Sequence, residues 1–260
     1  MSSKLQRQPG FIRFKNVSKT YSISKGKYGL LREIISDKVR YSLRNKQNDK
    51  SQVVHALNSL NFTINKGECV GVIGRNGAGK STILKLISKI TYPEAGSIEV
   101  MGRISAFIEL GAGLHHELTG KENIYLYGAI LGMKKSEIKE KFLEIVKFAG
   151  IEKFLDVPIK KYSSGMYSRL GFSVCAFSDP DILLVDEVLA VGDINFQKRC
   201  LAKMHSFIGT KTIIFVSHNM QAMRRVCTRV IYIEKGKVIK DGKPKPVIDY
   251  YVKKSKAAQN

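Results

Sequence analysis

The chain has 260 residues, with 43% apolar and 25% charged side chains, which suits one large globular domain or two small ones. It has no apolar run near the roughly 18 residues of a membrane-spanning helix, no apolar segment of a secretory signal, and four cysteines without CxxC spacing. These features argue against a membrane-spanning protein, a secreted protein, a disulfide framework and a zinc site. The scattered thiols suit the cytosol.

The net charge of +22 is concentrated near both ends of the chain, in residues 1–56 and 235–260. A basic surface of this kind indicates nucleic acid or an anionic membrane surface as a partner. A solvated surface without a specific partner explains the charge equally well.

The first part of the chain predicts short strands around one insertion. Residues 11–17 alternate between apolar and polar side chains, as a half-buried strand does. Residues 22–52 are basic and polar, with some apolar side chains at helical spacing, and we expect an insertion between strands. Residues 62–74 predict a hairpin with a Lys-Gly turn, and residues 96–110 predict two more short strands.

The middle of the chain predicts helices. Ser136 is positioned to cap a helix that stops at Gly150, because a hydroxyl accepts an amide of the first turn and glycine ends helices readily. The apolar residues of this helix share one face, and they are Ile138, Phe142, Ile145 and Ala149.

The last part alternates strands with helices. Residues 181–186 and 212–219 are short apolar runs, typical of parallel strands that are buried on both faces. Residues 230–242 predict a closing hairpin. The alternation predicts an α/β domain with a central parallel sheet spanning residues 1–250, followed by a disordered tail at 251–260.

The segment GRNGAGKST at 74–82 fits the phosphate-loop pattern G-x-x-x-x-G-K-[ST], and a predicted strand precedes it and a predicted helix follows it. Glycines let backbone amides point inward to bind an anion, and the helix start adds its positive dipole end. We expect Lys80 to reach the β and γ phosphates and Ser81 to ligate Mg²⁺. The predicted nucleotide contacts are Gly74, Asn76, Gly77, Ala78, Gly79, Lys80, Ser81 and Thr82.

Two polar strand ends complete the predicted chemistry. Asp186 ends one buried-type strand, where it is positioned to hold Mg²⁺ directly or through water, and Glu187 follows as the residue that orients or deprotonates the attacking water. His218 follows the next buried-type strand and is placed to sense or stabilise the γ-phosphate. A solvated acidic pair and a structural histidine are the alternatives.

The segment KYSSGMYSRLGFSV at 161–174 predicts a helix capped by Ser163 or Ser164, and it carries no nucleophile, metal ligand or acid–base pair. Taken in order, the phosphate loop, YSSGM, ILLVDE, AVGD and VSHN resemble the nucleotide-binding subunit of an ABC transporter. The resemblance covers roughly residues 10 to 250. It is close for exporters of lipid-linked polysaccharides such as O-antigen, capsule and teichoic acid.

The resemblance implies a P-loop NTPase cassette with a RecA-like parallel-sheet core, an antiparallel β subdomain and a helical subdomain at about 110–178. It implies that Tyr21 stacks on adenine and that Asp193 lies in a loop crossing a dimer interface. It implies that the signature residues bind the γ-phosphate of ATP held by the other subunit, and these are Ser163, Ser164 and Gly165.

Three departures from the common family pattern favour the polysaccharide-export branch. The signature has Ser164 and Met166 in place of a glycine and a glutamine, and Glu109 stands where a metal-contacting glutamine is usual. The insertion at 22–52 separates Tyr21 from the other nucleotide contacts. We expect this insertion to pack near the membrane, where its charge would meet anionic lipid or the pyrophosphate of the substrate, or to be solvated.

The resemblance also implies the partners. We expect a homodimer that binds two ATP molecules at its interface and works with two copies of a separate membrane permease on the cytoplasmic face of the inner membrane. An O-antigen-type glycan is the first choice of cargo, in lipopolysaccharide biosynthesis, with teichoic acid and capsule as alternatives. A soluble ABC ATPase acting on nucleic acid and an importer ATPase for a small solute are less favoured. We expect no carbohydrate-binding domain in this chain and no nucleic acid partner.

Overall fold

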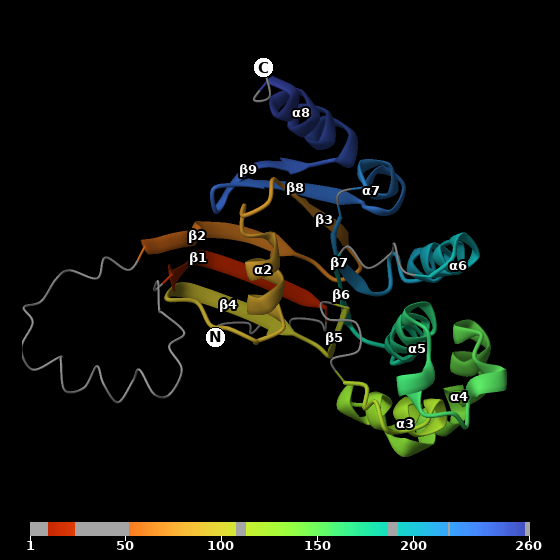
Figure 1. The fold of residues 1–260 in the computed structure, drawn as a ribbon. Coiled ribbons are helices and arrows are strands. Elements are labelled where there is room, and N and C mark those ends of the chain that lie inside the picture. Colours follow the sequence, from red (N-terminus) through yellow and green to blue (C-terminus); the bar gives the residue numbers. More distant parts are fainter. Residues whose placement is uncertain (1–9, 24–51, 108–112, 187–191, 218, 258–260) are drawn as a thin grey trace, which may run out of the picture.

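The computed structural model describes residues 10–23, 52–107, 113–186, 192–217 and 219–257. Its central sheet has six strands in the order β5-β6-β7-β3-β8-β9, and all of them are parallel except the edge strand β9 (Figure 1). The bounds are β3 Cys69–Ile73, β5 Ile104–Phe107, β6 Ile182–Asp186, β7 Thr212–Val216, β8 Arg229–Glu234 and β9 Lys237–Gly242.

A smaller antiparallel sheet has the order β2-β1-β4, with β1 Phe11–Ile23, β2 Gln52–Ile64 and β4 Ala95–Met101. The hairpin expected at 62–74 is wrong, because β2 belongs to this sheet whereas β3 belongs to the central one. The turn after β2 therefore leads the chain from one sheet to the other. The insertion is also shorter than predicted, since β1 reaches Ile23 and β2 begins at Gln52, and residues 24–51 lie outside the described residues.

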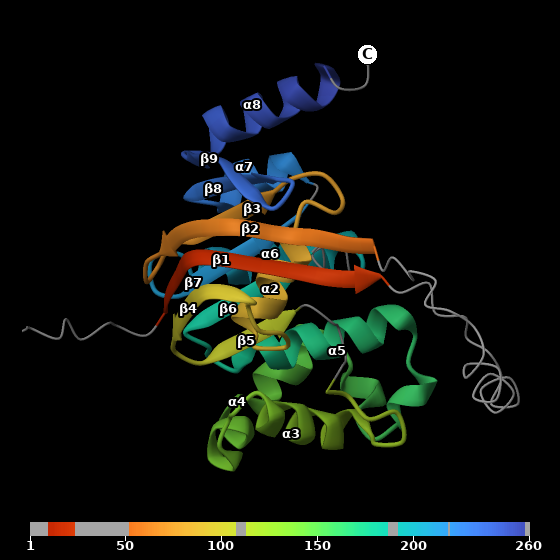
Figure 2. The ribbon, with the colours of Figure 1, turned by 90° about the vertical axis from the view of Figure 1, so that its left-hand side faces the viewer.

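Helices lie on both faces of the central sheet (Figures 1 and 2). Alternate residues of β7 point to opposite faces, so that Ile214 and Val216 join a core with the antiparallel sheet and α2, whereas Ile213 and Phe215 join a core with the other helices. Burial on both faces was expected and is confirmed. The helices are α2 Lys80–Ile87, α3 Gly120–Ile130, α4 Lys135–Ala149, α5 Ser164–Phe177, α6 Ile194–His205, α7 Met220–Val226 and α8 Pro244–Ala257.

Two helix ends differ from the predictions. Helix α4 is capped by Lys134, whose backbone amide donates to Glu137 Oε2 at 2.8 Å, so Ser136 lies inside the helix instead of capping it. Its expected end at Gly150 is confirmed, with φ of 64°. The tail expected to be disordered from residue 251 is helical as far as Ala257, and residues 258–260 lie outside the described part.

Across the described ranges, no helix has both the length and the apolar character needed to cross a bilayer.

Candidate nucleotide-binding site

The site begins where buried strand β3 passes into α2. Gly77 and Gly79 have φ of 77° and 105°, a region that residues with a side chain avoid. A Cβ atom at Gly79 would lie 2.6 Å from the carbonyl oxygen of Ala56, so position 79 has no room for one. Gly79 is also the N-cap of α2, and no side chain caps the helix. The first amides of α2 are thus offered to a ligand, and an anion suits them best.

Lys80 is the first residue of α2 and is buried. Its Nζ atom donates to the carbonyl oxygens of Gly74 at 2.9 Å and Arg75 at 3.1 Å. These two bonds fold the side chain back over the loop, which places a positive charge among amides that already favour an anion.

A pocket of about 360 Å³ joins this loop to other parts of the chain. Of the residues predicted for the site, Tyr21 of β1 and Asp186 of β6 lie in the same pocket as Lys80 and Ser81. The complete lining in the described chain is Tyr21, Val54, Ala56, Asn76, Gly77, Gly79, Lys80, Ser81, Thr82 and Asp186. The predicted residues Gly74 and Ala78 shape the loop without lining the pocket.

One part of the pocket lining comes from the antiparallel sheet, and it includes an aromatic and an apolar side chain. Tyr21 and Val54 are paired directly across β1 and β2, and their side chains are 39% and 40% exposed. An aromatic ring beside a branched apolar side chain offers a surface on which a planar base can stack. The sequence analysis did not predict Val54 and Ala56, because only the pairing of β2 with β1 brings these residues to the pocket.

Another part of the pocket lining carries oxygen ligands. The Ser81 hydroxyl and the Asp186 carboxylate belong to a donor set that suits a hard cation such as Mg²⁺, which takes few protein ligands beside phosphate and water. Asp186 ends β6, half-buried, and it is paired in register with Val216 of β7. The residues present therefore fit the metal that the phosphate loop implies.

Three predicted residues lie outside the described residues, and they are Glu109, Glu187 and His218. The strands that precede them in the sequence, β5, β6 and β7, are parallel neighbours whose carboxyl ends share one edge of the sheet with the end of β3. Ligands of open α/β sheets bind at this edge.

The signature residues lie apart from this pocket. Ser163 caps α5, its Oγ accepting the amide of Met166 at 3.2 Å, and Ser164 and Gly165 form the first turn. Ser163 and Ser164 are exposed, and none of the three lines the pocket that holds Lys80. Figure 1 shows α5 grouped with α3 and α4, whereas α2 lies against the antiparallel sheet. One chain therefore presents two separate helix starts, at α2 and at α5.

Asp193 caps α6, and its Oδ1 accepts the amide of Phe196 at 2.8 Å. This bond holds the pKa of the Asp193 carboxyl below its ordinary value, so the group is ionised at neutral pH. It also lies outside the pocket, 3.7 Å from Nη1 of Arg169 on α5.

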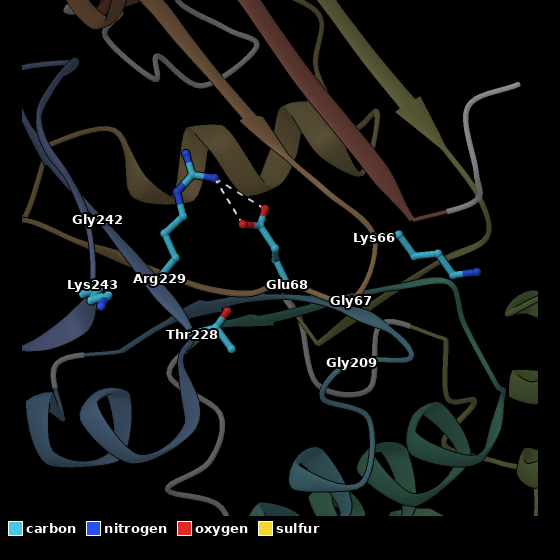
Figure 3. Close-up of a pocket in the computed structure, with 8 residues that line it drawn as sticks. All are labelled: Lys66, Gly67, Glu68, Gly209, Thr228, Arg229, Gly242 and Lys243. Carbon is cyan, nitrogen blue, oxygen red and sulfur yellow. Dashed lines mark hydrogen bonds and ion pairs between the residues drawn. The ribbon is translucent and has the colours of Figure 1, made fainter. Parts of the chain in front are cut away.

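A second pocket, of about 440 Å³, lies at the opposite edge of the sheet, where β3 and β8 begin (Figure 3). Its Arg229 points toward Glu68, and it donates from Nε and Nη2 to Asp241 at 2.7 and 2.6 Å and from Nη1 to the Thr63 carbonyl oxygen at 2.9 Å. Lys66 extends away from this group. The guanidinium is committed to internal partners, so this pocket is a structural junction between the two sheets.

Known proteins resemble this chain over nearly its whole length. The ABC transporter family model matches residues 57–190. The O-antigen export system ATP-binding protein RfbB of Klebsiella pneumoniae is 43% identical over 241 residues, which cover 92% of this chain and 96% of that protein. The teichoic acids export ATP-binding protein TagH of Staphylococcus epidermidis is 38% identical over 256 residues, which cover 95% and 93%.

Among solved structures, a dimeric ATP-binding cassette in a post-hydrolysis state, bound to ADP and Pi, matches with a TM-score of 0.69. The match covers 90% of this chain and 98% of that one, at 23% identity. It confirms the predicted fold class, a cassette with a parallel-sheet core, an antiparallel sheet and a helical block between β5 and β6.

Proposed function

The chain belongs to the ABC transporter family and couples ATP hydrolysis to transport, and we propose that its cargo is a lipid-linked polysaccharide of the O-antigen type. The pocket that joins Tyr21, Lys80, Ser81 and Asp186 carries the nucleotide part of this proposal. The relatives named for O-antigen and teichoic acid export support the cargo, and teichoic acid and capsule are the alternatives.

In this proposal the pocket holds ATP along its length. The adenine stacks on Tyr21 and Val54, and the amides from Gly77 to Ser81 receive the phosphates. The Lys80 ammonium turns from the loop carbonyls, where it donates at 2.9 and 3.1 Å, to the β and γ phosphates. Ser81 and Asp186 would hold Mg²⁺, which would supply positive charge to neutralise the phosphates.

Hydrolysis needs a group that activates water beside the γ-phosphate. Glu187 follows Asp186 at the end of β6, and we assign it the role of orienting the water and taking its proton. His218 follows β7, the strand between β6 and β3, and we assign it the stabilisation of the γ-phosphate. Glu109 follows β5, and we propose that it contacts the metal.

A second copy of the chain completes the site. The signature residues at the start of α5 lie outside the pocket of their own chain, yet their helix start suits an anion. A two-fold, head-to-tail dimer would bring the start of α5 onto the γ-phosphate bound by the partner, and would place Asp193 at the interface between the two chains. Two ATP molecules would then join the two chains, and hydrolysis would release them.

The proposed complex also contains two copies of a separate membrane permease, with this chain at the cytoplasmic face of the cytoplasmic membrane. The relatives are ATP-binding proteins of export systems, which supports a division of labour between an ATPase and a permease. ATP-driven closing and opening of the dimer would move the permease.

Dimer trapping tests the nucleotide part. We expect Glu187→Gln to bind ATP, lose turnover, and elute as a dimer on gel filtration with ATP and Mg²⁺, because the bridging γ-phosphate remains. Glu144→Gln, an exposed carboxylate on α4, is the matched control and should keep full turnover. Unimpaired turnover in Glu187→Gln would contradict the assignment of Glu187 as the base.

Deletion of the gene in its own host tests the cargo. An O-antigen-type exporter predicts loss of long lipopolysaccharide chains from the cell surface and accumulation of lipid-linked glycan inside. Loss of phosphate-rich wall polymer instead would select teichoic acid.

A further inference from the structure

Lys19 lies against the ring of Tyr21, the residue proposed to stack on the nucleotide base. Its Nζ atom lies 5.4 Å from the centroid of that ring. A cation within about 6 Å of the centroid of an aromatic ring is attracted by the negative charge of the π face. Among the described residues, Tyr21 lines the pocket and Lys19 does not. The Tyr21 ring therefore contacts both a cation and the pocket.

The Lys19 cation is held in place. Its Nζ atom donates to Oε1 of Glu94 at 3.2 Å, and its side chain is only 15% exposed. The other oxygen of Glu94, Oε2, accepts from the amide and the hydroxyl of Thr20 at 3.0 and 2.6 Å. Thr20 lies between Lys19 and Tyr21 in the chain, so one carboxylate fixes both the cation and the backbone beside the ring. The entropy of ordering this lysine is therefore lost on folding, before any nucleotide binds.

The cation changes how the Tyr21 ring can stack. Aromatic faces carry partial negative charge, so two of them repel each other when they lie directly face to face. A positive charge on one face draws electron density toward itself and leaves the opposite face less negative. A purine base is electron-rich, and it stacks more favourably on a face of that kind. The Tyr21 side chain is 39% exposed, so its ring keeps an accessible face.

We propose that Lys19 is a positioning residue for nucleotide binding, which fixes the Tyr21 ring and polarises it for a purine base on the opposite face. This inference rests on the proposed function, in which that ring stacks on adenine. Lys19 contacts no phosphate in this arrangement, because Glu94 holds its ammonium group, and it takes no part in hydrolysis. An ion pair that only stabilised the sheet would affect all ligands of the pocket alike, whereas a positioning role affects only ligands that carry a base.

Lys19→Met tests this role, because methionine keeps most of the apolar stem and removes the charge. We expect the Kd for ATP, measured by calorimetry, to rise about two- to fivefold, the scale of one cation–π contact at an exposed site, with kcat unchanged. Lys19→Gln can still donate to Glu94 without a charge, and it should weaken ATP binding as Lys19→Met does. Lys19→Arg keeps a cation at the ring and should bind ATP like the wild type. Inorganic triphosphate has no base, so its affinity should be the same in all four proteins.

A double-variant cycle shows whether Lys19 acts through Tyr21. Tyr21→Leu removes the ring, so adding Lys19→Met to it should cause no further loss of ATP affinity. Lys15→Met, at an exposed lysine on the same strand, is the matched control and should bind both ligands like the wild type. The Lys19 variants should fold, because the Glu94 side chain is 46% exposed and water can solvate its carboxylate.

Three results would overturn the role of Lys19. They are unchanged ATP affinity in Lys19→Met and Lys19→Gln, an equal loss of affinity for inorganic triphosphate, and a further loss in the Tyr21→Leu background. If Tyr21→Leu itself binds ATP like the wild type, the base stacking of the proposed function fails first. If Tyr21→Leu weakens ATP binding and the uncharged Lys19 variants do not, only the role of Lys19 fails, so the two failures are distinguishable.

Discussion

At the scale of single residues, the two glycines of the loop after β3 make different demands. Both have left-handed backbone angles, but a Cβ atom at Gly77 would meet nothing within 4 Å, whereas one at Gly79 would meet backbone at 2.6 Å. Gly77→Ala should therefore cost only the backbone strain, about 1–2 kcal/mol. Gly79→Ala should cost at least about 2 kcal/mol more and abolish ATP binding, measured by chemical unfolding and a fluorescent nucleotide. Equal effects would contradict the steric argument.

Glu94 holds Tyr21 in place without touching the pocket. Its Oε2 accepts from the amide and hydroxyl of Thr20 at 3.0 and 2.6 Å, and its Oε1 pairs with Lys19 at 3.2 Å. Glu94→Ala should raise KM for ATP several-fold and leave kcat unchanged, because it loosens only Tyr21, the proposed stacking residue. Glu117→Ala breaks another exposed ion pair, with Lys160, and should change neither constant.

The Glu94 carboxylate also makes the stability of the fold depend on pH. The Thr20 hydroxyl hydrogen bond holds the pKa of Glu94 below its ordinary 4.5. Its stabilisation is therefore complete above the unfolded pKa and is lost as the pH falls through the lower folded value. The unfolding midpoints of wild type and Glu94→Ala should differ at pH 7 and converge as the pH falls below 4.5 and through the folded pKa of Glu94. If the difference between the two midpoints grew in acid, it would contradict a lowered pKa for Glu94 in the folded state.

At the scale of elements, two capped helix starts allow the effect of a lost cap on stability to be told apart from its effect on activity. Ser163 caps α5 and Thr119 caps α3, each through a side-chain oxygen that accepts an amide at 3.2 Å. Replacing either with alanine should cost about 0.5–2 kcal/mol of stability, measured by urea unfolding. Only Ser163→Ala should also lower ATPase activity, because its helix start is the proposed phosphate site. Equal activity loss in Thr119→Ala would attribute the effect to folding.

Elements with strong local signals were predictable, and elements that depend on distant partners were not. The buried runs that became β6 and β7, and the glycine that ends α4, needed only local pattern. The hairpin at 62–74 was wrong because two adjacent strands can join different sheets, which the turn residues do not reveal. The tail is helical because Val247 and Ile248 are buried and Lys254 pairs with Glu234 of β8.

At the scale of the whole molecule, the proposed dimer makes the pocket of one chain and the signature of the other two halves of one site. Lys80→Ala should inactivate the pocket of one chain, and Gly165→Asp should put a carboxylate at the proposed binding site of the partner's phosphate. A Cβ at Gly165 would lie 3.9 Å from Ser163 Oγ, so this variant has room to fold. Mixing the two inactive variants should restore ATPase to about a quarter of the wild-type level, because half the dimers carry one intact site. No recovery would contradict a shared site.

The residues of the pocket differ in how far the sequence predicts them. The phosphate loop and Asp186 were readable as motifs, since each lies on its own strand end. Tyr21 was tied to them only by the family resemblance, and Val54 and Ala56 were not predicted. They meet because β1 and β2, on either side of the insertion, pair as far as Ile23 with Gln52, after three register shifts between Phe14 and Thr20.

That register has an engineering consequence. Because Ile23 and Gln52 face each other in an antiparallel pair, the strands can be rejoined by a two-residue Asn-Gly turn in place of residues 24–51. Shortening the connection should lower the chain entropy lost on folding, by about 1.5–2 kcal/mol. The shortened chain should melt higher and bind nucleotide as before, measured by calorimetry. With binding intact, any loss of export in cells would then belong to the removed basic segment alone.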